Sequence, residues 1–223
     1  YTLLDFVDEI IAQQPDLILI YAGHNEYLGI MGVGSAFAAK GGRLTTLLHL
    51  QFKDWRLYQL LQKLYFALLP ADEQNIKTNK TLMSQVVKEK EINFASDLFE
   101  QGAAQFKGNM SLILQKYQAA GIPVVLSNLV SNESGQVPFS SVGKFDWQAY
   151  QGDLSKENVP AEIARLDNIS DEDKNAQDYY QLALNLQLLA RYSEAKKAFV
   201  LAKDHDLLRF RAPSKFNNII KEL

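Results

Sequence analysis

Cysteine is absent from the sequence, which excludes disulfide bonds, thiolate metal ligands and a cysteine nucleophile. Histidine is scarce, and the three histidines are His24, His49 and His205. His205 lies between Asp204 and Asp206, but one histidine with two neighbouring carboxylates does not supply the ligand set of a zinc site. We therefore expect no metal and no other cofactor.

Long hydrophobic runs and a strong excess of charge are also missing. No apolar run approaches the roughly 20 residues that a membrane-spanning helix needs, and residues 1–5 have neither the basic start nor the cleavage site of a signal peptide. The net charge of −3 gives no basis for a nucleic-acid-binding surface. With 223 residues, 47% of them hydrophobic, the chain can bury a core as one large domain or two small ones.

Residues 3–13 have the pattern of an amphipathic helix that is already running at the start of the chain. Pro15 ends this helix, and the chain then enters an apolar run. A helix that leads into a buried strand is half of a β-α-β unit, so a preceding strand is implied. We therefore expect the sequence to be an internal piece of a longer protein. The sequence does not indicate a cellular compartment. The chain fits a soluble segment of a parent protein that is extracytoplasmic or tethered to a membrane.

Residues 15–29, PDLILIYAGHNEYLG, carry the strongest pattern in the chain. The apolar run at 17–22 is too short for an average helix and is rich in β-branched and aromatic residues. It therefore predicts a strand at about 16–22 that is buried on both faces. The strand ends at a polar cluster, Gly23, His24, Asn25 and Glu26. Open parallel sheets bind ligands at the carboxyl ends of their strands, so this cluster is the first candidate site.

A second parallel strand is predicted at about 123–130, within the apolar sequence IPVVLSNLV. A long amphipathic helix at 94–120 precedes it, and Gly121 stands where a helix usually stops. The order of helix, glycine and strand predicts a right-handed crossover to a parallel neighbour of the first strand. Asn109 on the helix and Asn128 at the strand end are further polar candidates, of which Asn128 is the better placed.

Three segments lie between the two strands. Residues 29–42 contain five glycines and predict a flexible rim of the site. They lack the Lys-Ser/Thr pair of a phosphate-binding loop and a helix start at the right place, so phosphate binding is not expected there. Leucines and aromatic residues at helical spacing predict one long helix or two short ones over 44–69, on the site side of the strand. Residues 72–91 are polar and lysine-rich, which predicts an exposed connection.

The first strand and its GHNE ending resemble the third conserved block of the SGNH (GDSL-like) hydrolases, an apolar strand followed by Gly-x-Asn-Asp. The following Tyr27-Leu28-Gly29, and GVGS at residues 32–35, resemble the subgroup that also carries tetratricopeptide-type repeats. The resemblance implies a partial flavodoxin-like, three-layer α/β domain. It also implies an ester hydrolase with a serine–histidine acyl-enzyme mechanism, acting on a small-molecule, carbohydrate or lipid ester. An O-acetyltransferase on the same fold is an open alternative.

The resemblance also implies roles for individual residues. In that family the asparagine of the third block holds the oxyanion, a role that falls on Asn25, and Gly23 lets the backbone turn at the strand end. Glu26 stands where the family has aspartate, and Glu26, Tyr27 and Asn128 are candidates for substrate binding. From the residues alone, Asn25 could instead be a turn residue that caps the strand.

The serine and histidine blocks of that family are missing. The one Gly-Asp string close to a serine is Gly152-Asp153-Leu154-Ser155, which comes after the third block and follows no buried strand. No histidine has an aspartate three residues before it, as the last block of the family requires. We therefore expect the chain alone to be inactive, and His24, at the variable position of the motif, to be structural.

Residues 155–207 have a different pattern, which resembles a tetratricopeptide unit of two helices packed through alanines. The matching positions are Tyr179, Leu182, Ala183, Leu186, Tyr192, Ala195, Phe199 and Ala202. Ala190 stands at the usual turn glycine and Leu207 at the usual terminal proline. A helical pair of this kind can bind a protein partner, so a non-enzymatic interaction module is the second hypothesis.

The predicted organisation is an incomplete SGNH-like α/β core at 1–145 with a helical cap at 44–69, a helical insertion at 155–207, and a return helix at 208–223. Strands without outer neighbours expose backbone groups, so self-association through residues 17–21 is expected. We expect neither nucleic-acid binding nor a membrane span from this chain.

Overall fold

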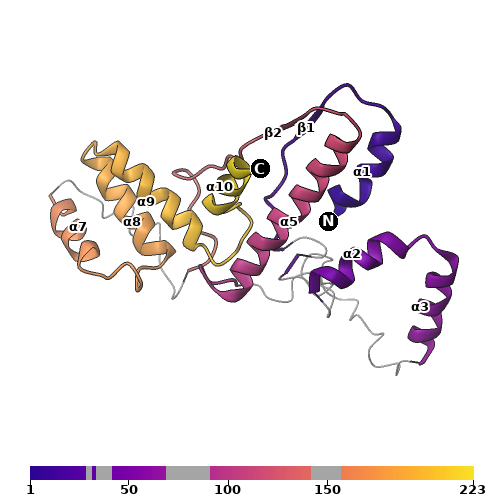
Figure 1. Cartoon of the computed structure of the whole chain (residues 1–223). Helices are drawn as coiled ribbons and strands as arrows, with labels where there is room; N and C mark the ends of the chain where they lie inside the picture. The colour runs from indigo at the N-terminus through magenta and orange to yellow at the C-terminus, as the bar shows by residue number, and fades with distance from the viewer. Residues whose placement is uncertain (29–31, 34–41, 69–90, 142–156) are drawn as a thin grey trace.

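Helices dominate the computed structural model of the chain (Figure 1). The structure describes residues 1–28, 32–33, 42–68, 91–141 and 157–223, of which 59% lie in helices and 3% in strands. In chain order its elements are α1 (Thr2–Ala12), β1 (Ile18–Ile20), α2 (Gly42–Phe52), α3 (Arg56–Leu68), α5 (Asp97–Ala119), β2 (Val124–Leu126), α7 (Val159–Asp167), α8 (Ala176–Leu188), α9 (Tyr192–His205) and α10 (Ser214–Glu222). None of these helices is long and apolar enough to cross a membrane.

The sheet of the described chain contains only β1 and β2, which pair in parallel as predicted. One face of the sheet packs on the larger of two hydrophobic cores, the first core. The side chains on that face are Ile18, Ile20, Val124 and Leu126. The other face is open, because the paired side chains of Leu19 and Val125 are 72% and 52% exposed.

The prediction of a flavodoxin-like, three-layer domain is wrong for this chain. The strands span 18–20 and 124–126 instead of about 16–22 and 123–130, and only one face of their sheet is covered. A strand is held by bonds to its neighbours, and with one neighbour each these strands end where their mutual pairing ends. The apolar run at 17–22 indicated burial on both faces, but such a run does not guarantee a covering layer. Self-association through the unpaired edge at 17–21 stays a prediction.

Helix α5, predicted at 94–120, organises the first core. The Ser96 side chain caps its start by accepting a hydrogen bond from the Phe99 N–H at 3.2 Å. Gly121, with a φ of +72°, follows its end. Helices α1 and α10 pack on α5. The buried side chains of this core include Val7, Ile20, Tyr27, Leu28, Phe99, Phe106, Met110, Ile113, Tyr117 and Phe216.

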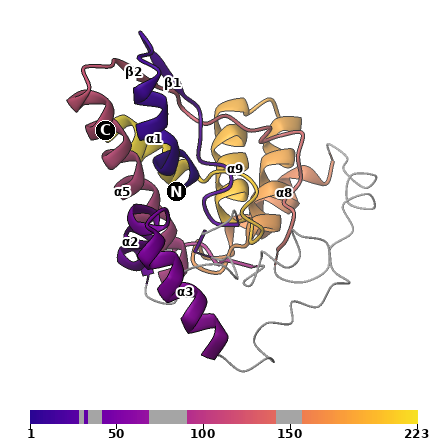
Figure 2. The same ribbon diagram turned by 90° about the vertical axis from the view of Figure 1, so that its right-hand side faces the viewer.

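Helices α8 and α9 form the helical hairpin predicted within 155–207, and α7 packs beside α8 (Figures 1 and 2). They share a second core, made of Val159, Ile163, Tyr179, Tyr180, Ala183, Leu186, Ala195, Ala198, Phe199 and Ala202. Tyr192, although predicted on the packed face, is 66% exposed. The likeness of the hairpin to a tetratricopeptide unit stays a prediction. Gly152-Asp153-Leu154-Ser155 lies outside the described residues.

Ala190, in the turn between α8 and α9, has a left-handed φ of +57°. The N–H groups of Ala190 and Arg191 donate to the carbonyls of Gln187 and Leu186 at 3.0 and 2.9 Å, the bonding pattern of a helix end that favours glycine. We predict that Ala190→Gly raises the free energy of unfolding by about 0.5–1 kcal/mol in urea denaturation, because glycine adopts this φ without strain. Ala161→Gly, inside α7, should instead lower it by about 1 kcal/mol. Equal losses in both variants would contradict the strain at Ala190.

A buried polar cluster joins the hairpin to the first core. Arg209 is 2% exposed, and its guanidinium donates to the Ile92 carbonyl at 2.7 and 3.0 Å and to the Asp204 carbonyl. The Asp204 carboxylate accepts the Ser214 N–H at 2.8 Å. The Asp206 carboxylate accepts the backbone N–H groups of Phe139, Ser140 and Leu208 at 2.9, 3.0 and 3.2 Å. These bonds give both aspartates a structural role, because they join the end of α9 to the start of α10 and to residues 139–140.

Helices α2 and α3 form an arm, residues 42–68, where one long helix or two short ones were predicted. Helix α2 packs on the body through Thr46, which is 5% exposed. An ion pair of 2.6 Å between Lys53 and Asp5 ties the arm to α1. Helix α3 projects away from the body (Figures 1 and 2). No described residue of the arm lines the cavity at the end of β1, and the role of the arm as a cap over that site stays a prediction.

Candidate functional site

A cavity of about 630 Å³ lies at the carboxyl end of β1. Its walls come from the start of α1, the segment that follows β1, Gly32 and one face of α5. The apolar wall includes Leu3, Phe6, Phe106, Met110 and Ile113. The polar groups include Asn25, Glu26 and Asn109. A mainly apolar cavity with a few polar groups is the usual form of a small-molecule site.

Gly23 directs the chain into this cavity from the end of β1. Its φ of +151° lies in the region that favours glycine. A side chain would also not fit, because a Cβ at this position would lie 2.5 Å from Cδ1 of Leu129 and 3.3 Å from Cε2 of Phe106. The close approach of the Gly23 backbone to these side chains sets the position of the three polar residues that follow.

His24 lines the cavity but is held by bonds on both ring nitrogens. Its Nδ1 accepts the Ala212 N–H at 3.2 Å, so in the neutral ring the proton is on Nε2, which lies 3.2 Å from the Tyr21 hydroxyl. That hydroxyl donates to the Val130 carbonyl at 3.2 Å. Burial, together with the positive charge of Lys203, lowers the pKa of His24 and favours this neutral form. His24 therefore connects the site to the segments that follow β2 and α9.

Glu26 is a partly buried carboxyl group at the cavity wall. Burial raises the pKa of Glu26 above the usual value, because the charged carboxylate loses its hydration. The positive α-amino group of Tyr1 opposes this shift. A carboxyl group with a raised pKa retains its proton more readily than an exposed one. The protonated group can then donate a hydrogen bond into the cavity.

We predict that Glu26→Gln raises the free energy of unfolding at pH 7.5. The raised pKa means that the folded state binds the proton more tightly, so the wild type loses stability as the pH rises from the ordinary glutamate pKa through the raised one. Glutamine has no charge to desolvate, and its advantage should shrink as the pH falls toward 4.5. Urea denaturation at both pH values measures this. Glu172→Gln, at an exposed position, is the control, and a destabilising Glu26→Gln at pH 7.5 would contradict the prediction.

The amide groups of Asn25 and Asn109 both line the cavity. Asn25 is exposed. Asn109 is 4% exposed, and its Nδ2 and Oδ1 are both buried without a partner in the part of the chain that the structure describes. A buried amide that lacks a partner is rare in folded proteins and calls for an explanation. Two neutral amides beside an apolar wall can donate hydrogen bonds to a carbonyl oxygen whose hydrocarbon chain packs on that wall.

Two of the predicted site residues do not line the cavity. Tyr27 is 1% exposed and donates its hydroxyl hydrogen to the Phe99 carbonyl at 2.9 Å, and its ring stacks on Phe99 and Phe216 at 5.6 and 5.5 Å. Burial raises the pKa of its hydroxyl. Asn128 is exposed, because the chain leaves the sheet beyond β2 and buries the next side chain, Leu129. Tyr27 therefore anchors the turn, and Asn109 takes the place that Asn128 was expected to occupy.

Asn109 was a candidate from the sequence, although Asn128 was preferred, and one further signal favours Asn109. It lies on the same helical stripe as Phe106 and Met110, where an amide interrupts an apolar face. The other predicted features of the site lie largely outside the described residues, which include only Gly32, Val33 and Gly42 of the glycine-rich segment at 29–42.

Comparisons with known proteins do not constrain this site further. Among the described residues, no group of three or more histidine, aspartate or glutamate side chains could hold a metal ion. No protein-family model matches the chain, and neither the curated proteins nor the solved structures contain a significant match.

Proposed function

We propose that the cavity binds the acyl part of an ester, with the side-chain amide of Asn25 donating a hydrogen bond to the carbonyl oxygen. This role for Asn25 follows the resemblance to the SGNH hydrolases, and it does not require their three-layer fold. In the parent reaction a serine attacks the carbonyl and forms an acyl-enzyme, as the resemblance implies. The chain contributes the acyl cavity and the oxyanion donor to that reaction.

The observation that carries the proposal is the unpartnered amide of Asn109 at the same cavity. A buried polar group without a partner costs about 1–3 kcal/mol, which a ligand that bonds to it would recover. The carbonyl oxygen of a bound acyl group can accept from Nδ2 of Asn109. The adjoining apolar wall, with Phe106, Met110 and Ile113, suits the hydrocarbon part of the acyl group.

An amide is suited to this chemistry because it donates a hydrogen bond while it remains neutral. Negative charge builds up on the carbonyl oxygen as the nucleophile attacks, and a fixed donor stabilises that charge. Removing one such donor typically costs about 10²–10³-fold in rate. His24 does not act as the base here, because both of its ring nitrogens hold structural bonds. O-acetyl transfer would use the same donors, and analysis of the products separates it from hydrolysis.

The test is binding of hexanamide, a carbonyl probe with a short hydrocarbon chain, measured by calorimetry. Asn25→Ala should weaken binding about 3- to 10-fold, the value of one net hydrogen bond. Asn109→Leu should also weaken binding, yet it should raise the free energy of unfolding by about 1–2 kcal/mol because it removes an unsatisfied buried amide. Asn128→Ala, at an exposed position outside the cavity, is the matched control and should change neither quantity.

The opposite pattern at Asn109 would overturn the proposal. If Asn109→Leu destabilises the fold and leaves hexanamide binding unchanged, the amide has a structural partner and no ligand role. If Asn25→Ala and Asn128→Ala have the same affinity for hexanamide as the wild type, Asn25 is not the donor.

A further inference from the structure

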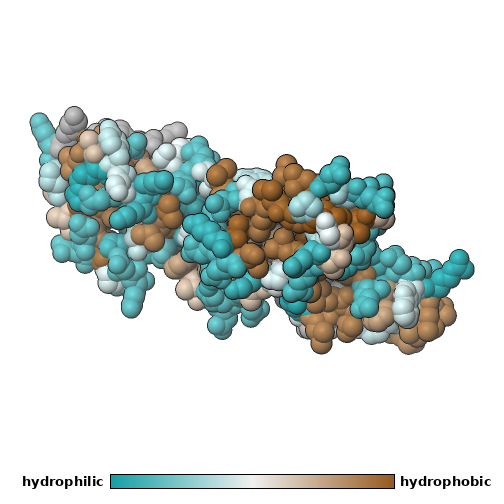
Figure 3. All heavy atoms as spheres, turned by 45° about the horizontal axis from the view of Figure 1, so that its top comes forward, coloured by the Kyte–Doolittle hydropathy of each residue, from teal (hydrophilic) through white to brown (hydrophobic). Residues whose placement is uncertain are grey.

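Helix α3 exposes its entire apolar face as a leucine stripe. The stripe consists of Leu57, Leu60, Leu61, Leu64 and Leu68, which are 53% to 86% exposed. At 3.6 residues per turn these positions share an arc of about 100° on one side of the helix. Space-filling atoms show a hydrophobic surface at the end of the molecule that carries the arm (Figure 3). Burial of such a stripe is strongly favourable, so the stripe needs a partner outside the described residues.

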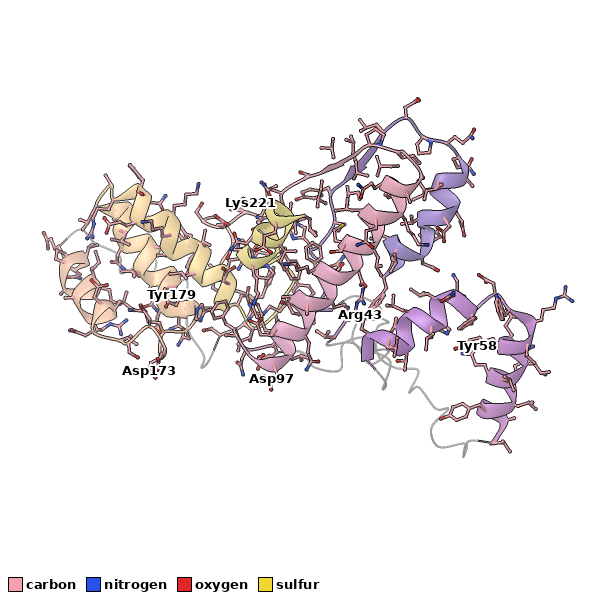
Figure 4. The ribbon with its side chains drawn as sticks, viewed as in Figure 1. Arg43, Tyr58, Asp97, Asp173, Tyr179 and Lys221 are labelled. Atoms are coloured by element: carbon pink, nitrogen blue, oxygen red, sulfur yellow. The ribbon has the colours of Figure 1, made fainter. Side chains whose placement is uncertain are left out.

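The arm holds α3 in a defined position relative to the body. The Tyr58 hydroxyl of α3 lies 2.9 Å from Nδ1 of His49 in α2, and Tyr58 is labelled in Figure 4. The rings of Phe52 and Trp55 pack edge to face at 4.8 Å across the bend between the two helices. The ion pair of Lys53 with α1 fixes the other side of this bend. The leucine stripe is therefore presented on a supported helix.

The charges beside the stripe indicate the kind of partner. Residues 55–68 contain Arg56 and Lys63 and no acidic residue, in a chain whose net charge is −3. Both cationic side chains are exposed, and they lie on the polar side of α3 next to the stripe. Trp55, at the start of the helix, is 60% exposed. Leucines on one face, cations beside them and an aromatic residue at one end are the features of a helix that lies in a membrane interface.

We propose that α3 lies on the surface of an anionic lipid bilayer, with its leucine stripe at the boundary of headgroups and acyl chains. Arg56 and Lys63 then reach the lipid phosphates while their carbon stems stay beside the leucines. Pairing of two copies through the stripe is the competing arrangement. It is disfavoured because α3 offers no acidic residue to pair with Arg56 or Lys63 of a second copy. The proposal does not depend on the function of the cavity.

The test uses the full chain and two kinds of vesicle, phosphatidylcholine alone and phosphatidylcholine with about one third phosphatidylglycerol. Trp147→Phe leaves Trp55 as the only tryptophan, so a blue shift of its fluorescence reports insertion. The chain should bind the anionic vesicles and bind more weakly as salt is added. The double variant Leu61→Asp/Leu64→Asp should weaken this binding by about 100-fold. Arg56→Gln/Lys63→Gln should weaken it by about 10-fold or more.

The control is Gln59→Ala, on the polar side of α3, which should bind the vesicles like the wild type. The variants within α3 should keep the helical circular dichroism spectrum, because the side chains changed there are exposed. Absence of binding to anionic vesicles would overturn the proposal. So would equal binding to both kinds of vesicle with no effect of salt. A dimer in light scattering that Leu61→Asp/Leu64→Asp converts to a monomer, without vesicle binding, would assign the stripe to a second copy instead.

Discussion

Replacing Gly23 by alanine is expected to lower the free energy of unfolding by about 2–4 kcal/mol. The backbone φ of +151° is costly for any residue with a side chain, at about 1–3 kcal/mol. The new Cβ would also lie 2.5 Å from a methyl carbon of Leu129, and relieving such crowding costs about 1–3 kcal/mol more. Small movements of the neighbouring side chains relieve part of the crowding, so we expect the two costs together to be about 2–4 kcal/mol. Urea denaturation followed by circular dichroism measures the loss.

Gly121→Ala is the matched control for this prediction. Gly121 also has a positive φ, +72°, but a Cβ there would meet no atom within 4 Å. Its replacement should therefore show the backbone cost alone, about 1 kcal/mol. If Gly23→Ala and Gly121→Ala lower the free energy of unfolding equally, Leu129 and Phe106 do not crowd Gly23. The close approach of the Gly23 backbone to these side chains would then be contradicted.

Replacing Arg209 by alanine is expected to lower the free energy of unfolding by about 3–5 kcal/mol, because buried hydrogen bonds from a charged group to two carbonyls are lost together. The variant loses the bonds to the carbonyls of Ile92 and Asp204, and it loses the contact of the guanidinium with the Phe99 ring at 4.9 Å. Burial lowers the pKa of the guanidinium to about 10, so the group remains charged at neutral pH. Thermal unfolding should change from one transition to two if the hairpin separates from the first core.

Lys107→Ala is the surface control for Arg209. Its ammonium group pairs with Glu222 of α10 at 2.7 Å, and both side chains are more than half exposed. Such a pair contributes at most about 1 kcal/mol. A loss as small as this for Arg209→Ala would show that the cluster around Arg209 does not hold the two parts together.

Local patterns in the sequence were sufficient for the elements of the fold but not for its layers. The stripe of Phe99, Phe106 and Tyr117, with Gly121 after it, gives α5 nearly to its ends, because a helix is specified by its own periodicity and end signals. The parallel pairing of residues 18–20 with 124–126 follows from the intervening helix. The length of the strands and the open face at Leu19 depend on neighbours, which no local pattern specifies.

The site was predictable in part for the same reason. Asn25 and Glu26 belong to the polar cluster that the sequence places after the first strand, five and six residues beyond the end of β1, and both line the cavity. Asn128 lies two residues beyond the end of β2, but its side chain is exposed and does not reach the cavity. Asn109 comes from a helix face, so its approach to the cavity depends on how α5 packs against the sheet. That packing is a tertiary property, and the sequence shows it only as an amide on an apolar stripe.

The central claim is that the amides of Asn25 and Asn109 bind one carbonyl group. Nuclear magnetic resonance of the side-chain NH₂ groups during a hexanamide titration tests it most directly, because each amide reports its own hydrogen bond. We predict that the NH₂ resonances of both residues shift together with one dissociation constant, while those of the exposed Asn128 do not. Shifts confined to other asparagines, or none at saturating hexanamide, would contradict the account.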